Sequence, residues 1–224
     1  MTYEQLPDEM KNESTRQYWD MLEARRFSLA CKRAFDVGVS AVSLLILSPF
    51  FLILAAAIKL DSPGSVFYRQ VRVGRYNRDF RIYKFRTMVR DADKLGPPLT
   101  TGRDPRVTRV GSLIRKLRLD EFSQFLNVLG GSMSFVGPRP EVRRYVDAYL
   151  PEGMATLLVR PGLTAPSSIA FRDEDKLLSS ADDPEKIYVE KILPPKTAMN
   201  LDYLRHISVL RDIGIMFRTV KTVF

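Results

Sequence analysis

One apolar segment dominates the pattern of hydrophobic and polar positions along the chain. Residues 37–58 read VGVSAVSLLILSPFFLILAAAI, which is 22 residues without a charged side chain. A straight helix of that length is about 33 Å long, enough to cross the hydrocarbon core of a bilayer. The alternative is a buried core helix, but such helices are rarely free of charge for so long. We therefore expect this segment to lie in a membrane.

Two features of the segment argue against a simple crossing. Pro49 lies near its middle, directly after Ser48. Proline removes a helical hydrogen bond and bends the helix, and a serine hydroxyl can return a hydrogen bond to the opened backbone. Both flanks are basic, with Arg25, Arg26, Lys32 and Arg33 before the segment and Lys59, Arg69, Arg72 and Arg75 after it. Because basic flanks stay on the cytoplasmic side, the pattern favours a re-entrant helix-break-helix over a kinked spanning helix.

The rest of the pattern predicts an α+β fold that is mostly helical. The expected elements are strands at 66–68 and 80–85, a loop at 91–108, helices at 111–128 and 142–149, and helical structure over 182–224. Apolar residues alternate with spaced basic ones over 204–224. That pattern fits a helix at a membrane surface and a core-packed amphipathic helix equally well.

The same pattern divides the chain into three parts. Residues 1–31 are polar and form an N-terminal tail that does not resemble a signal peptide. Residues 32–60 form the re-entrant membrane segment, with Ser48 and Pro49 at its break. Residues 61–224 form a cytoplasmic domain with interfacial C-terminal helices.

Charge and composition narrow the chemistry. The net charge is +9, and residues 59–118 alone hold sixteen Lys or Arg against five Asp or Glu. Such a block suits nucleic acid, anionic lipid headgroups or a phosphorylated substrate. With Cys31 the only cysteine and His206 the only histidine, a zinc cluster or a histidine-dependent triad is excluded. Neither a P-loop nor a dinucleotide-binding glycine motif occurs, whereas a magnesium site of carboxylates and phosphates stays open.

An acidic pair at the end of the basic block is the candidate for catalysis. Asp120 and Glu121 lie within RKLRLDEF. Neighbouring helical residues point about 100° apart, so one carboxylate could attack phosphorus while the other holds a divalent cation. Arg115 would attract phosphate oxygens nearby. Judged on spacing alone, a solvated helix face with ordinary ion pairs is favoured instead.

Two basic motifs are candidates for phosphate binding. Lys84, Phe85 and Arg86 alternate basic and apolar positions, as a strand with one cationic face or a surface edge strand would. Arg139 lies between Pro138 and Pro140. Prolines restrict the backbone on both sides, which suits bidentate phosphate recognition by the arginine or a merely rigid loop.

Five motifs in order then match a family. They are the apolar segment with its Ser-Pro break, YKFRTM (83–88), DPRVTRVG (104–111), LRLDEFSQFLNVLGGSMSFVGPRPE (117–141) and RPGLT (160–164). From about residue 32 to residue 224 the chain resembles the bacterial sugar transferases, the monotopic polyprenyl-phosphate phosphoglycosyl transferases of the small type.

The resemblance implies a reaction and its participants. Members transfer a sugar-1-phosphate from a UDP-sugar to undecaprenyl phosphate and release UMP, as the first membrane step of a glycoconjugate pathway. Asp120 would form a covalent phosphosugar ester, and Asp120 and Glu121 would hold Mg²⁺. The implied phosphate and substrate contacts are Lys84, Arg86, Arg115 and Arg139, with Asp173 a weaker candidate. The implied location is the cytoplasmic face of the bacterial inner membrane among membrane lipids, with a monomer and a homodimer both open.

The chain departs from the family pattern at two positions. Ser123 stands where many members have proline after the acidic dyad Asp120–Glu121, and Ala165 stands where many have glycine. Both departures leave the identity of the sugar open. A non-catalytic membrane adaptor and a membrane-tethered nucleic-acid binder are the competing hypotheses, and no recognition motif supports nucleic acid as a partner.

Overall fold

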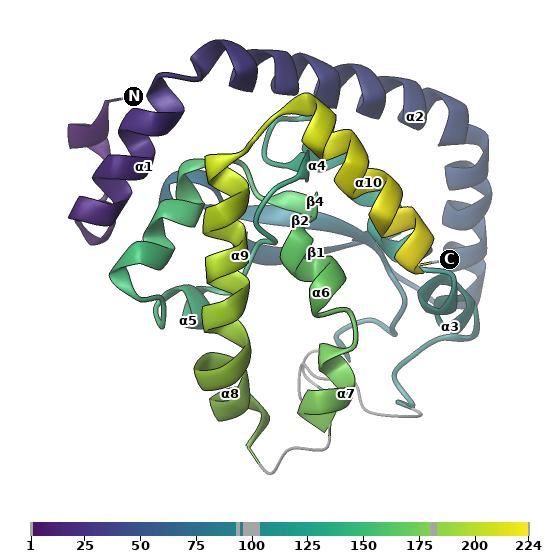
Figure 1. The fold of residues 1–224 in the computed structure, drawn as a ribbon. Coiled ribbons are helices and arrows are strands. Elements are labelled where there is room, and N and C mark those ends of the chain that lie inside the picture. The colour runs from purple at the N-terminus through teal and green to yellow at the C-terminus, as the bar shows by residue number, and fades with distance from the viewer. Residues whose placement is uncertain (1, 93–94, 96–103, 180–182, 224) are drawn as a thin grey trace.

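The longest element, the helix α2 (Arg26–Asp61), runs along one side of the protein and then turns down a second side (Figure 1). The computed structural model describes residues 2–92, 95, 104–179 and 183–223, so most of the loop expected at 91–108 lies outside the described residues. Helices dominate and the few strands are short. This confirms the predicted mostly helical α+β class.

The other elements follow in chain order. They are η1 (Tyr3–Gln5), η2 (Asp8–Met10), α1 (Glu13–Glu23), β1 (Phe67–Val73), η3 (Arg75–Asn77), β2 (Asp79–Phe85), α3 (Arg109–Lys116), η5 (Leu119–Gln124), α4 (Phe125–Leu129), β3 (Ser134–Val136), α5 (Arg143–Val146), η6 (Pro151–Leu158), β4 (Gly162–Thr164), α6 (Pro166–Ala170), α7 (Glu174–Ser179), α8 (Pro184–Ile187), η7 (Tyr188–Ile192), α9 (Leu193–Arg205) and α10 (Val209–Val223).

The proline in α2 does not interrupt the helix, which curves along its length (Figure 1). Pro49 lies inside the helix and has no N–H for the carbonyl of Leu45, four residues earlier. The hydroxyl of Ser48 donates to that carbonyl at 2.8 Å. The compensation expected of the serine is therefore confirmed, and residues 26–61 stay helical throughout.

Within the described residues α2 is the one helix long and apolar enough to cross a membrane. Only 11% of its most apolar 18-residue window is buried against the rest of the protein. A core helix would be mostly covered, so the exposed apolar surface of α2 fits contact with lipid.

The N-terminal residues belong to the folded body. Leu6, Met10, Tyr18 and Leu22 are buried in the main core, although residues 1–31 read as a polar tail. Tyr18 and Leu22 become buried because α1 packs on η6 and α9, and η2, which carries Met10, also packs on η6.

Two small sheets form the centre of the protein. β1 and β2 pair antiparallel, and β3 and β4 pair parallel. The strand predicted at 80–85 is confirmed. β1 extends well beyond the predicted 66–68, and the polar residues in its second half are the reason that the sequence pattern did not reveal this extension. The single helix predicted over 111–128 is wrong: Arg118 adopts φ 54°, ψ 24°, a left-handed conformation that ends one helix before the next begins.

Polar and apolar contacts fix the end of α2 to the central elements. Ile58 packs with Phe85 of β2 and Ile114 of α3 in a small apolar cluster. Asp61 accepts a 2.9 Å hydrogen bond from the N–H of Val110 at the start of α3. Since strand and helix both attach here, α2 sets the position of the elements that carry the basic motifs.

The start of α2 is fixed equally firmly. Lys32 donates to the carbonyl of Val136 at 2.9 Å and forms a buried ion pair with Asp212 of α10. Asp36 accepts from the N–H of Phe135 at 3.2 Å, and Tyr203 donates to Asp212 at 2.7 Å. The helix α2 is thus attached to the folded domain at both ends.

Candidate active site

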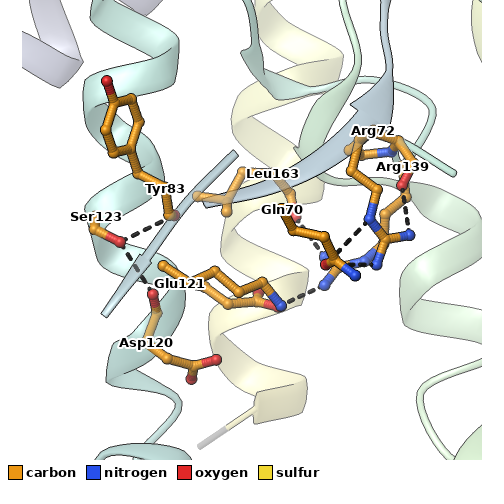
Figure 2. Close-up of polar contacts among 10 residues, drawn as sticks. Gln70, Arg72, Tyr83, Asp120, Glu121, Ser123, Arg139 and Leu163 are labelled. Atoms are coloured by element: carbon orange, nitrogen blue, oxygen red, sulfur yellow. Dashed lines mark hydrogen bonds and ion pairs between the residues drawn. The ribbon is translucent and has the colours of Figure 1, made fainter. Parts of the chain in front are cut away.

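The acidic pair lies in a short 3₁₀ helix rather than in an α-helix. Asp120 and Glu121 occupy the first turn of η5, just after the left-handed Arg118. The buried hydroxyl of Ser123 donates to the carbonyl of Tyr83 in β2 at 3.0 Å and to the carbonyl of Asp120 at 3.1 Å (Figure 2). Successive residues of a 3₁₀ helix point about 120° apart, so the two carboxylates face different surroundings.

Glu121 is held between two cations. Its Oε1 accepts a 2.5 Å hydrogen bond from Nη2 of Arg139 and lies 4.0 Å from Nζ of Lys84. Burial alone would raise the pKa of Glu121, but the charges of Arg139 and Lys84 lower it to about 2. Glu121 is therefore a stable anion, and no described residue donates a hydrogen bond to its Oε2.

Asp120 faces a cavity instead. Burial and the neighbouring charge of Glu121 raise the pKa of Asp120, while Lys84 and Arg115 oppose the rise. Its side chain points away from Glu121 in Figure 2. A partly desolvated carboxylate next to open space is suited to act as a nucleophile once cations hold it in its ionised form.

The cavity has a volume of about 960 Å³ and a strongly cationic wall. It is lined by parts of β1 and β2 and the segments that flank them, together with Arg115 and Asp120. Its basic lining residues are Arg69, Arg72, Lys84, Arg86, Arg90 and Arg115. The wall begins at Gly64, three residues after α2 ends at Asp61, so the cavity lies beside the end of α2.

Three of the four predicted phosphate contacts gather around the dyad. Lys84 and Arg115 line the cavity with Asp120, and Arg139 approaches from the other side of Glu121. Arg139 also donates to the carbonyl of Leu163 at 3.1 Å, which fixes its guanidinium in place. The proline-flanked arginine is thus held by a neighbouring strand as well as by its own backbone.

Arg86 also lines the cavity but makes its hydrogen bonds to the end of α2, whereas Asp173 lies outside the cavity lining. The Nη2 of Arg86 donates to the carbonyls of Ile58 and Ser62 at 3.2 and 2.6 Å, which caps the end of α2. Its Nε and Nη1 are buried without a hydrogen-bond partner. Asp173 is exposed, pairs with Arg172 at 3.1 Å, and is not among the described residues that line the cavity.

The structure adds residues to which no motif pointed. Asn127 is buried and joins α4 to β2, because it accepts from the N–H of Tyr83 at 2.8 Å and donates to the carbonyl of Arg81 at 2.9 Å. Gln70 and Arg72 of β1 line the cavity. The alternation of residues along 68–72 was the signal that could have placed these two on one face of a strand.

The two carboxylates fit a magnesium site in which phosphate oxygens of the substrate would supply the remaining ligands. Among the described residues no group of three or more acidic, histidine or cysteine side chains could enclose a metal. Mg²⁺ is commonly held by one or two carboxylates together with substrate phosphates. Asp120 and the uncommitted Oε2 of Glu121 meet that requirement.

Comparison with known proteins decides the family. Residues 27–224 match the bacterial sugar transferase family. The chain belongs to this family. The match begins one residue after α2 starts and includes the cavity, the dyad and both C-terminal helices.

Three relatives illustrate the range of the family. The chain is 40% identical over 195 residues to the UDP-N-acetylgalactosamine-undecaprenyl-phosphate N-acetylgalactosaminephosphotransferase of Aeromonas hydrophila, which covers 86% of this chain and 43% of the relative. It is 41% identical over 194 residues to the UDP-glucose:undecaprenyl-phosphate glucose-1-phosphate transferase of Escherichia coli (strain K12), over 84% of this chain and 39% of the relative. It is 37% identical over 199 residues to the exopolysaccharide production protein PSS of Rhizobium leguminosarum bv. phaseoli, over 86% of this chain and 94% of the relative.

The chain thus spans less than half the length of the first two relatives and nearly all of the third. The first two names specify different sugars at comparable identity to this chain. Identity alone therefore does not select the sugar.

Proposed function

We propose that this bacterial sugar transferase moves a sugar-1-phosphate from a UDP-sugar to undecaprenyl phosphate and releases UMP. The observation that carries the proposal is the placement of Asp120 in a cationic cavity beside the end of α2. A diphosphate donor from the cytosol and a phosphate at headgroup depth both need such a site. The names of two relatives give the donor and acceptor classes.

The chemistry proceeds in two displacements. In the first, a carboxylate oxygen of Asp120 attacks the sugar-side phosphorus, and the bond from that phosphorus to the bridging oxygen breaks. The bridging oxygen leaves with the electron pair as part of UMP. In the second, a phosphate oxygen of undecaprenyl phosphate attacks the same phosphorus, the bond to Asp120 breaks, and the carboxylate returns. One site thereby serves both substrates in turn.

The neighbouring residues stabilise the charge on the phosphates. Lys84 and Arg115 lie on the cavity side of Asp120 and attract phosphate oxygens. Arg139 keeps Glu121 ionised and oriented. Asp120 and Glu121 would hold Mg²⁺, which supplies positive charge to the diphosphate when bound.

We further propose that α2 enters and leaves the same cytoplasmic leaflet. Three observations support this arrangement: the curve of α2, which contains Pro49 (Figure 1), the basic residues at both ends, and the attachment of both ends to one folded domain. The C-terminal helix α10 exposes Leu210, Phe217 and Val220 by 83, 72 and 57%. An apolar face of this kind suits a helix that rests on the membrane surface.

The function is tested by UMP release from membranes that contain the full chain. A panel of UDP-sugars is supplied with undecaprenyl phosphate, with and without EDTA. We expect UMP release for one or a few donors, its loss with EDTA, and its recovery with Mg²⁺. Absence of UMP release for every donor would overturn the proposed function, and full activity in EDTA would overturn the metal assignment.

The covalent step is tested without the acceptor. The unaltered chain should release a single stoichiometric burst of UMP and gain the mass of a phosphosugar on the peptide that contains Asp120. Asp120→Asn should show neither effect, whereas Asp147→Asn, which changes an exposed carboxylate outside the cavity, should show both. A normal burst in Asp120→Asn would assign the nucleophile to another residue.

A further inference from the structure

Arg72 is a partly buried cation that contacts no carboxylate among the described residues. Its Nη2 and Nε donate to Oε1 of Gln70 at 3.0 and 3.3 Å, and its Nη1 donates to the carbonyl of Pro140 at 3.3 Å. All three acceptor contacts are to neutral groups, and none of the ion pairs among the described residues includes Arg72. Burial lowers the pKa of Arg72, the charge of Glu141 opposes that shift, and the charge of Arg139 adds to it more weakly.

Such an arrangement is electrostatically incomplete. Buried charges in proteins are ordinarily paired, and Arg139 has such a pair in Glu121, whereas Arg72 contacts only neutral groups. A guanidinium also has more N–H donors than the three contacts of Arg72 use. Arg72 is therefore ready to bind an anion that the protein itself does not provide.

The strand register directs Arg72 into the cavity. In the β1–β2 pair, Tyr68 lies opposite Lys84, Gln70 opposite Ile82, and Arg72 opposite Phe80. Opposed residues in a sheet share a face, and alternate residues along a strand return to it. Gln70, Arg72 and Lys84 consequently lie on one face of the hairpin, and all three line the cavity together with Asp120.

Along the cavity, Arg72 lies beyond the dyad. The charges of Glu121 and Asp120 favour a higher pKa for Lys84, whereas those of Arg139 and Arg72 favour a lower one, so all four groups lie near it. Figure 2 shows Asp120 at one end of the group and Arg72 at the other, with Glu121 and Arg139 between them. The site therefore has the nucleophile Asp120 at one end and the cationic side chain of Arg72, which can bind an anion, at the other.

We propose that Arg72, oriented by Gln70, binds the phosphate of the departing nucleoside monophosphate. This inference rests on the proposed function. In an in-line displacement the leaving oxygen lies opposite the attacking oxygen, so the nucleotide-side phosphate extends away from Asp120. When the bond between the sugar-side phosphorus and the bridging oxygen breaks, that phosphate gains a negative charge. Arg72 stabilises this charge through two N–H donors in the fork geometry of a guanidinium.

A purely structural role for Arg72 makes a different prediction. In that case the arginine only joins β1 to the Pro138–Arg139–Pro140 turn, and its removal would disturb the whole site. Binding of uridine and of UMP would then weaken together. A phosphate contact instead affects UMP and leaves uridine, which has no phosphate, unchanged.

Two variants and one control separate these roles. Arg72→Met removes the guanidinium. Gln70→Glu keeps the shape of the side chain but places a carboxylate against Arg72, which competes with phosphate for its donors. Arg81→Met removes the same charge from the exposed face of the same hairpin, outside the cavity lining. If Arg72→Met fails to fold, Gln70→Glu provides the test.

The measurement is ligand-observed NMR and calorimetry on the full chain in detergent, with UMP and uridine as probes. We expect UMP affinity to fall about 10- to 100-fold in both variants, as loss of a charged hydrogen bond to phosphate implies. Uridine affinity should not change, and Arg81→Met should match the unaltered chain. Unchanged UMP affinity in Gln70→Glu, equal weakening of uridine, or no UMP binding by the unaltered chain would each overturn the proposal.

Failure of this inference is distinguishable from failure of the proposed function. If the unaltered chain binds UMP through Arg72 but releases none from any UDP-sugar, the function is wrong and the anion site stands. If it releases UMP and Gln70→Glu has an unchanged KM for the donor, the function stands and the role of Arg72 is wrong.

Discussion

Glu121 and Arg139 form the contact that separates the roles of the two acidic residues. Oε1 of Glu121 accepts a 2.5 Å hydrogen bond from Arg139, while Asp120, one residue earlier, lines the cavity. Arg139 is in turn fixed by the carbonyl of Leu163 in β4. One carboxylate is thereby paired and oriented, and the adjacent one stays available for chemistry.

Arg139→Met should destabilise the protein by about 1–2 kcal/mol. The side chains of Glu121 and Arg139 are 24 and 40% exposed, so solvent screens part of the pair and the full penalty for a buried ion pair does not apply. Urea unfolding in detergent, followed by the fluorescence of Trp19, gives the free energy of unfolding. In Glu121→Gln/Arg139→Met the two effects should be less than additive, and strict additivity would show that the pair is not coupled.

Pro49→Leu should change the topology of α2. Without proline the helix of 36 residues becomes straight and about 54 Å long, which exceeds the bilayer core and takes its second end across the membrane. Cys31 is the only native cysteine and is exposed, so Cys31→Ser/Ser65→Cys reports on the second end alone. Impermeant maleimide added to intact cells should label neither site in the unaltered helix and should label position 65 once Pro49 is replaced.

A chain that keeps Pro49 and carries the cysteine at position 65 provides the decisive control for that experiment. Labelling at only one of positions 31 and 65 from outside would contradict the re-entrant arrangement and favour a kinked span. Permeabilised cells should label both positions, which shows that each thiol is reactive.

The buried ion pair between Lys32 and Asp212 should behave as a coupled unit. The two side chains are only 9 and 2% exposed. Lys32→Met or Asp212→Asn leaves an uncompensated buried charge, and each should cost about 3–5 kcal/mol. The double variant removes both charges and keeps an acceptor for Tyr203, so it should recover most of the lost stability. A double variant as unstable as the sum of the two single ones would contradict this interpretation.

Gly111→Ala should destabilise the junction between α3 and the strand that carries Lys84. A Cβ at this position would lie 2.0 Å from the carbonyl oxygen of Thr87, and backbone cannot move aside as a side chain can. We expect a loss of about 1–3 kcal/mol from the displaced backbone, together with reduced activity because α3 also carries Arg115. Gly214→Ala is the matched control, since nothing lies within 4 Å of its added Cβ and alanine favours a helix.

Local chemistry made part of this structure predictable from the sequence. The absence of charge over 22 residues and the Ser48–Pro49 pair predict a bent membrane helix, because proline removes a specific hydrogen bond and serine can replace it locally. The Ser48–Leu45 hydrogen bond confirms that reasoning. The strand at 80–85 was equally predictable, since its alternation is a property of neighbouring residues.

Other features depended on contacts between distant segments. The predicted helix over 111–128 ends at Arg118, whose left-handed backbone no local pattern indicates and which the packing of η5 against β2 imposes. Arg86 lines the cavity, so its predicted role as a phosphate contact stays a prediction, but only the structure shows that it also caps the end of α2, because folding brings that end beside β2.

The sequence by itself determined the membrane segment, the family resemblance and the identity of the acidic pair, all of which depend on residues close together in the chain. Only the tertiary structure decided which carboxylate is paired, which one faces the cavity, and which arginine lacks an anion. Arg72 shows the reason: its partners Gln70 and Pro140 and its neighbour Arg139 are brought together by strand pairing and by a turn 68 residues away. Electrostatic pairing depends on distance in space, which sequence spacing does not reveal.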